Sequence, residues 1–85
     1  MSRLTHKHYV GEKVLEVAYG YDFPLQEYFI QVFDPNIEDE DQQCIVDEGN
    51  FCTGKSNIQM YHLFKDYGVP YVYLACVLND VPIVD

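Results

Sequence analysis

Residues 20–35, GYDFPLQEYFIQVFDP, decide the fold of this chain. Within them, residues 26–33 alternate with a period of two, which is typical of a β-strand that has one face in a hydrophobic core. The face that we expect to be buried consists of Tyr28, Ile30 and Val32. Pro24 donates no backbone hydrogen bond, so it marks the turn before this strand. We therefore expect residues 26–33 to complete the central hairpin of a sheet.

Two further strands are expected before this one, at residues 5–10 and 13–21. The second alternates clearly, and one of its faces carries Leu15, Val17, Tyr19 and Tyr21. Gly11 begins the two-residue connection between them, and this suits a type II′ turn because glycine accepts a positive φ at its first position. After the central hairpin, the short apolar run at 44–46 predicts a fourth strand, and we expect residues 47–55 to be a loop.

Residues 57–67 predict an α-helix. Ser56 and Gln59 have the spacing of a capping box, in which each side chain bonds a free amide at the other residue. One stripe along this helix is apolar and consists of Met60, Leu63, Phe64 and Tyr67. Gly68 follows as the left-handed residue that ends the helix.

Residues 70–79 are apolar on all sides, which fits either a helix or a strand buried on both faces. We favour a helix, because one other helix does not cover both faces of such a strand. Its inner face would carry Tyr71, Leu74, Ala75 and Leu78. Its outer face would expose Val72, Tyr73, Cys76 and Val77, and an exposed apolar patch of this kind points to a contact with another subunit.

These elements predict a two-layer α+β fold. An antiparallel meander sheet of three or four strands would be packed by the helix at 57–67 and by the C-terminal helix at 70–79. Residues 1–85 are expected to form one small globular domain, because a chain of this length has no room for a second.

The chain is strongly acidic, with fourteen Asp and Glu against five Lys and Arg, a net charge of −9. This balance argues against binding to nucleic acid or to an anionic membrane, because both require cations. It permits a basic protein partner. Four adjacent carboxylates lie in a polar loop after the central hairpin and form a candidate interaction surface: Glu38, Asp39, Glu40 and Asp41.

The sequence favours a cytoplasmic protein. It shows neither a signal peptide nor a run of 18 apolar residues. Three cysteines are therefore expected to be free thiols in a reducing compartment, although a disulfide between Cys44 and Cys52 is possible.

Residues 49–56, GNFCTGKS, match the pattern G-x-x-x-x-G-K-[ST] between a short strand and a helix. These eight residues resemble the Walker A motif of P-loop nucleotidases. The resemblance implies a phosphate site at Gly49, Gly54, Lys55 and Ser56, with Lys55 on the outer phosphates and Ser56 on Mg²⁺. That family has a parallel sheet, whereas the first half of this chain predicts antiparallel hairpins. Ser56 also has a structural explanation as a helix cap.

No metal site, cofactor or catalytic set is predicted. The cysteines lack the C-x-x-C spacing of a zinc site, and His6 and His8 are expected to be surface residues. Cys52 precedes a helix, which would lower its pKa and allow catalysis with His62 if the two were close.

We therefore expect a non-catalytic protein–protein interaction or regulatory module, whose partner is a protein or a second copy of the chain. The alternative is a phosphate- or nucleotide-binding protein that uses residues 49–56.

Overall fold

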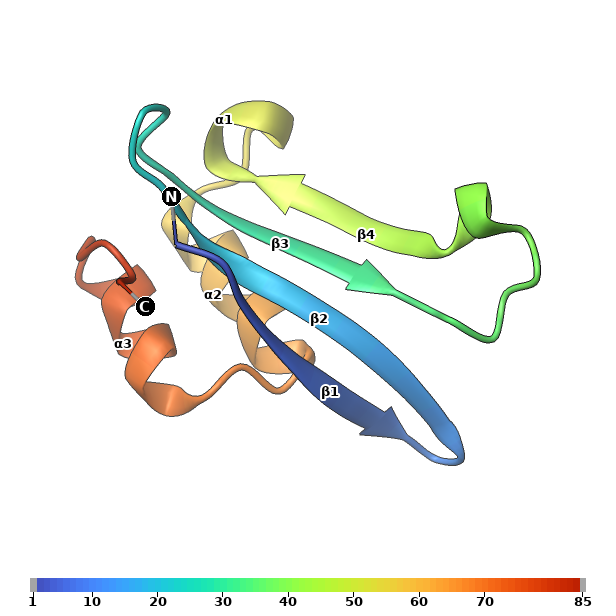
Figure 1. Cartoon of the computed structure of the whole chain (residues 1–85). Coiled ribbons are helices and arrows are strands. Elements are labelled where there is room, and N and C mark those ends of the chain that lie inside the picture. Colours follow the sequence, from blue (N-terminus) through green and yellow to red (C-terminus); the bar gives the residue numbers. More distant parts are fainter. Residues whose placement is uncertain (1, 85) are drawn as a thin grey trace.

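The computed structural model describes residues 2–84 and shows a two-layer α+β fold (Figure 1). The sheet has the order β1-β2-β3-β4, and every neighbouring pair is antiparallel. Its strands are β1 (Leu4–Val10), β2 (Lys13–Asp22), β3 (Glu27–Phe33) and β4 (Cys44–Gly49). The helices are η1 (a 3-10 helix, Glu40–Gln42), α1 (Asn50–Thr53), α2 (Asn57–Asp66) and α3 (Tyr71–Leu78). The predicted fold class and the antiparallel meander are confirmed.

The central hairpin joins the two apolar faces that its sequence predicts. Tyr19 lies opposite Ile30, and Val17 lies opposite Val32, so the alternating residues of β2 and β3 share one side of the sheet. The connection between β1 and β2 contains Gly11 with φ +60°, a value that a two-residue hairpin turn requires. The register of the central hairpin thus places the alternating apolar residues of both strands on the same side.

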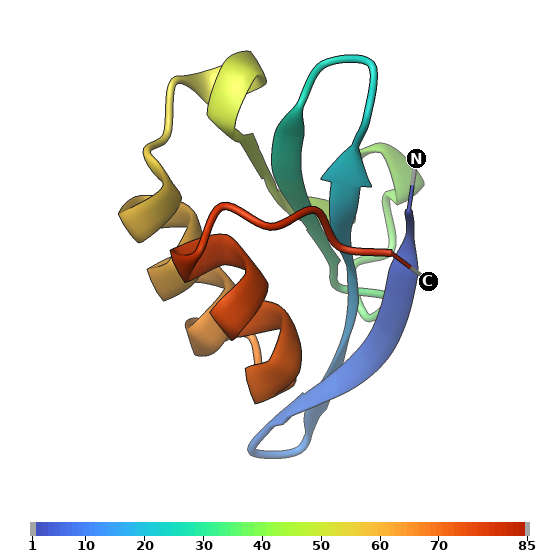
Figure 2. The same cartoon turned by 90° about the vertical axis from the view of Figure 1, so that its left-hand side faces the viewer.

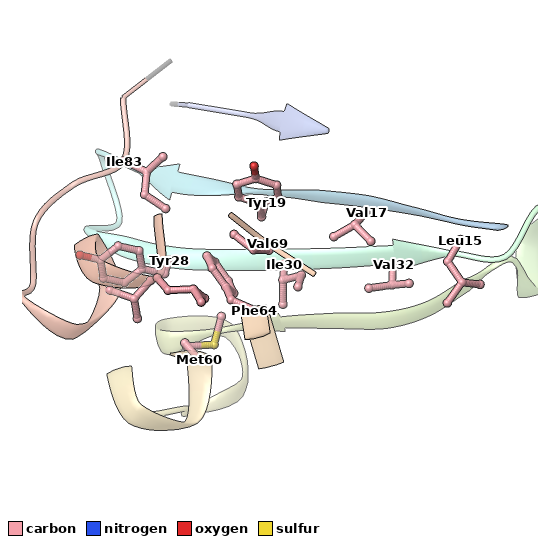
Figure 3. Close-up of a cluster of buried hydrophobic side chains, with 12 residues drawn as sticks. Leu15, Val17, Tyr19, Tyr28, Ile30, Val32, Met60, Phe64, Val69 and Ile83 are labelled. Carbon is pink, nitrogen blue, oxygen red and sulfur yellow. The ribbon is translucent and has the colours of Figure 1, made fainter. Parts of the chain in front are cut away.

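Helices α2 and α3 lie on one side of the sheet and form the second layer (Figure 2). The core between the layers is apolar, and Figure 3 shows sheet residues pointing at the side chains of the helical layer. From the sheet it takes Leu15, Val17, Tyr19, Tyr28, Ile30 and Val32. From the rest of the chain it takes Met60, Phe64, Val69, Leu74, Val77 and Ile83.

The predictions for residues 44–55 were wrong in two places. β4 is longer than 44–46, because Asp47 and Glu48 continue the pairing with β3 up to Gly49. An edge strand accepts such charged residues because one of its sides remains open to water. The following residues were expected to be a loop, but α1 turns there and ends at Gly54, which has φ +70°.

Helix α2 forms as its sequence predicts. Ser56 accepts a hydrogen bond from the amide of Gln59, and the Gln59 side chain accepts one from the amide of Ser56. Met60 and Phe64 are fully buried, and Gly68 follows the helix with φ +77°. The helix prediction at 70–79 is confirmed too, as α3 begins after Pro70.

The segment after α3 is attached to the core through Tyr28. Its buried hydroxyl lies 2.6 Å from the carbonyl oxygen of Val81 and 3.1 Å from that of Cys76. Burial raises the pKa of Tyr28, and the nearby carboxylate of Asp80 raises it further. Because Ile83 is also fully buried, this terminal segment is part of the packed structure.

Candidate protein-binding surface

The outer side of α3 exposes a row of apolar side chains. Tyr71 is 78% exposed, Val72 is 61% exposed and Leu78 is 52% exposed. A helix with 3.6 residues per turn places Tyr71 and Leu78 in line, with Val72 beside them. No charged residue occurs from position 67 to position 79. We call Tyr71, Val72 and Leu78 the α3 face.

This face differs from the predicted one. Of the three α3 residues expected at an interaction surface, only Val72 is exposed. Val77 is fully buried, and Tyr73 is half-buried with its ring 5.6 Å from that of Tyr19. The helix is docked through Leu74 and Val77, which lie three residues apart on one side. Because the helix is apolar on all sides, its sequence did not indicate which side would be buried.

The acidic loop lies at the other end of the molecule (Figure 1). Glu38, Asp39, Glu40 and Asp41 are all exposed, and the Asp39 side chain accepts a hydrogen bond from the amide of Asp41 at the start of η1. The α3 face and these carboxylates are therefore two separate surfaces.

Asp34 anchors the base of this loop. Its carboxylate accepts a hydrogen bond from the amide of Asn36 at 3.0 Å and lies 3.4 Å from the ammonium of Lys13. The Asn36 amide, together with the charge of Lys13, holds the pKa of Asp34 below its usual value. The loop thus projects from a fixed base.

The P-loop-like residues 49–56 form a strand end, the turn of α1 and the start of α2. The side chain of Asn50 lies inside this segment, where its oxygen accepts a hydrogen bond from the amide of Tyr28 at 2.8 Å. Its nitrogen donates to the carbonyl oxygen of Lys55 at 2.9 Å and to the side chain of Asn57 at 3.1 Å. A polar side chain of the protein therefore connects the turn to β3 and α2.

Several donors of this segment already bind protein oxygens. The amide of Gly49 donates to the hydroxyl of Thr53 at 3.2 Å, and the amide of Phe51 donates to the carboxylate of Glu27 at 3.2 Å. The ammonium of Lys55 lies 4.0 Å from the carboxylate of Glu48. The four predicted phosphate-site residues thus lie in one segment, but one amide of this segment, that of Phe51, already donates its hydrogen bond to a carboxylate. Phosphate binding at Gly49, Gly54, Lys55 and Ser56 stays a prediction.

The expected activation of Cys52 is wrong. Its thiol donates a hydrogen bond to the carboxylate of Glu27 at 3.3 Å, and the same negative charge repels a thiolate. Both effects raise the pKa of Cys52 rather than lower it. The disulfide that we left possible is not formed: Cys44 and Cys52 are free thiols, and Cys44 begins β4 whereas Cys52 lies in α1, after the other end of that strand.

The expectation for His6 and His8 is also wrong, because both are half-buried. Even-numbered residues of β1 face the helical layer, where His6 donates a hydrogen bond from Nε2 to the carbonyl oxygen of Tyr67 at 2.9 Å. Two histidines thus contact the C-terminal end of α2. Within residues 2–84, no group of three or more His, Cys, Asp or Glu side chains has an arrangement that holds a metal ion.

The uncovered face of the sheet carries a feature that sequence reasoning missed. The guanidinium of Arg3 donates to the side chain of Gln31 at 2.9 Å, and Gln31 donates to Asp47 at 3.4 Å. Arg3 reaches over β2 because that strand presents only Ala18 and Gly20 there. Beside this row lies a shallow hollow of about 450 Å³. The signal was present in the sequence as two small residues that alternate along β2.

Comparisons of this chain with family models, with curated proteins and with solved structures gave no match in any of the three. None of the helices within residues 2–84 combines the length and the hydropathy needed to cross a membrane.

Proposed function

We propose that this protein is a non-catalytic protein-binding module of the cytoplasm and that it contacts its partner through the α3 face. The observation that carries the proposal is the exposure of Tyr71, Val72 and Leu78 on a helix that has no charged residue. A helix that is apolar on all sides is normally buried on all sides. Helix α3 is buried on one side only, so we infer that its exposed side is covered by a partner protein.

The size of the α3 face indicates its role in such a complex. Fully burying one large apolar side chain stabilises by about 1.5–3 kcal/mol, so three partly exposed ones supply roughly 3–5 kcal/mol. Association itself costs about 4 kcal/mol or more. The α3 face would therefore be the apolar centre of an interface whose rim lies on neighbouring elements. Because the protein is strongly acidic, a partner with a neutral or basic rim fits best.

A photo-crosslinking residue at position 72 tests the proposal directly. In extract of the native host, we expect a crosslinked protein of defined mass, and we expect the change Tyr71→Ser to abolish it. The matched control carries the same crosslinker at His62, an exposed position in the middle of α2. If positions 72 and 62 give the same products, the α3 face is not a binding surface.

Phosphate or nucleotide binding by residues 49–56 is a second proposal. It is favoured by one observation, the order of strand, glycine-containing turn and capped helix that the motif requires. Titration with ATP and Mg²⁺ should shift the amide resonances of Gly54, Lys55 and Ser56, and the change Lys55→Ala should remove the effect. Unchanged resonances at millimolar nucleotide would exclude this proposal.

A further inference from the structure

We propose that the outer edge of β1 is a second interaction surface and that it pairs with β1 of a second copy of this chain. The two copies would be related by a two-fold axis, and their sheets would join into one continuous antiparallel sheet. This inference concerns a different part of the molecule from the α3 face, so either can fail while the other holds.

In the part of the chain that the structure describes, no strand pairs with the outer edge of β1. The amide of Ser2 donates to the carbonyl oxygen of Tyr21, which makes Ser2 and Tyr21 a hydrogen-bonded pair. In an antiparallel ladder such pairs alternate with pairs whose amides and carbonyls point away from the partner strand. By this alternation the register with β2 leaves four residues with outward amides and carbonyls: Arg3, Thr5, Lys7 and Tyr9. Within residues 2–84, none of these four has a backbone hydrogen bond outside the sheet.

The other edge, β4, is a poorer template for a strand. Its last residue, Gly49, is already occupied, because its amide donates to the hydroxyl of Thr53 and its carbonyl accepts from the same hydroxyl at 2.9 Å. At its other end, the pairing with β3 is interrupted between Val32 and Phe33. Irregular pairing, short length and charged side chains, lysine above all, are among the ways in which proteins protect edge strands. β1 is seven residues long and has no irregularity in its register, so of these protections it has only the charged side chains of Arg3 and Lys7.

The charge of the chain favours β1 over β4 as the edge where two copies meet. Arg3 and Lys7 are two of only five cations, and no carboxylate side chain occurs before Glu12. Every other part of the sheet carries Asp or Glu, so two copies of this acidic protein repel each other least where their β1 strands meet. The same consideration disfavours contact between two β4 strands, because Asp47 and Glu48 would face their own copies.

An axis at His6 is the one register that pairs all four outward residues of β1 with one another, and the cations favour it as well. A two-fold axis at Thr5 would place Arg3 opposite Lys7 of the second copy, and an axis at Lys7 would place two lysines opposite each other. Like charges that lie directly opposite destabilise a strand pair. An axis at His6 instead places Arg3 opposite Tyr9 and Thr5 opposite Lys7. Tyr9 is 68% exposed in the single chain, so its ring is free to take a cation–π contact from Arg3 once the guanidinium leaves Gln31, its hydrogen-bond partner in the single chain.

Amide hydrogen exchange tests the pairing, since β1 contains its own control. At about 20 µM the outward amides of Thr5, Lys7 and Tyr9 should exchange quickly, and at about 1 mM they should slow by roughly tenfold or more. The inward amides of His6 and His8 should be protected at both concentrations. Light scattering should show the mass rising toward twice 9.9 kDa over the same range.

The change Thr5→Pro supplies a variant that blocks only the pairing. The Thr5 amide points outward by the alternation, so its removal leaves the bonds to β2 intact. We expect Thr5→Pro to be monomeric at about 1 mM, and Thr5→Ser, which keeps the amide, to behave as the original protein. Exchange that is equally fast at both concentrations, or a mass that grows beyond two chains, would overturn the proposal without any variant.

Discussion

The change Tyr28→Phe should destabilise the protein through one hydroxyl group. Tyr28 is 1% exposed, and its hydroxyl lies within hydrogen-bond distance of the carbonyl oxygens of Val81 and Cys76. Phenylalanine keeps the ring in the core, so the apolar packing is preserved. The carbonyl oxygen of Val81 loses its donor, however, and the segment after α3 is then held by the buried side chain of Ile83 without this hydrogen bond.

The magnitude follows from the burial of this hydrogen bond. A typical hydrogen bond contributes about 0.5–1.5 kcal/mol, and leaving a buried acceptor without a partner costs about 1–3 kcal/mol. The Cys76 carbonyl still accepts from the amide of Val81 at 2.8 Å, so one acceptor is left without a partner, and we expect a loss of about 2 kcal/mol in the free energy of unfolding. In a domain of this size each kcal/mol shifts Tm by about 4–8 °C, so Tm should fall by about 8–16 °C.

Urea and thermal unfolding followed by circular dichroism measure this loss, with Tyr71→Phe as the matched control. Tyr71 is exposed, so its change should stay within about 0.5 kcal/mol. The reasoning would be refuted by equal stabilities of the two variants.

The raised pKa of Tyr28 adds a pH signature. The folded protein holds this proton more tightly than the unfolded chain, whose tyrosines have a pKa of about 10. The stabilising contribution is therefore fully present below about pH 10 and is lost as pH rises above it. Tyr28→Phe should lose less stability between about pH 9 and about pH 11 than the original protein does.

Three further changes test the other structural assignments. Ser56→Ala removes the helix cap and should lower the free energy of unfolding by about 1 kcal/mol in urea titrations. Glu27→Gln removes the charge that raises the pKa of Cys52, so alkylation of Cys52 at pH 8 should become faster while that of Cys44 stays the same, as followed by mass spectrometry. The lowered pKa of Asp34 gives stability that is present above about pH 4 and is lost as pH falls below it, so Asp34→Asn should show a smaller drop in the urea midpoint between pH 7 and about pH 3.

The elements that were predicted correctly have strong local patterns. β2 and β3 alternate over their whole length, and α2 has a capping box, an apolar stripe and a terminal glycine. In these segments local preference and tertiary packing favour the same structure. The sequence therefore predicted the antiparallel meander, the core face of β3 and one helix with its buried side.

The errors occur where one local pattern permits several structures. Helix α3 is apolar on every side, so only packing against Tyr19 and the core selects Leu74 and Val77 as its buried residues. α1 depends on Glu27, which lies 24 positions before Phe51 in the chain. His6 was assigned to the surface because no pattern within β1 reveals that α2 ends above it. Long-range contacts of this kind leave no periodic signal.

The P-loop-like match shows how structural requirements alone produce a functional pattern. A Cβ at Gly49 would lie 2.5 Å from the carboxylate of Glu27, so a larger residue there would displace the side chain that accepts from the amide of Phe51. Gly54 has a left-handed backbone, which glycine adopts without strain. Ser56 caps α2, and Lys55 lies beside Glu48. Each residue that makes the match thus has a role in this antiparallel fold. The nucleotide titration is decisive for this reason: the residues are explained without a ligand, so only a measured shift supports one.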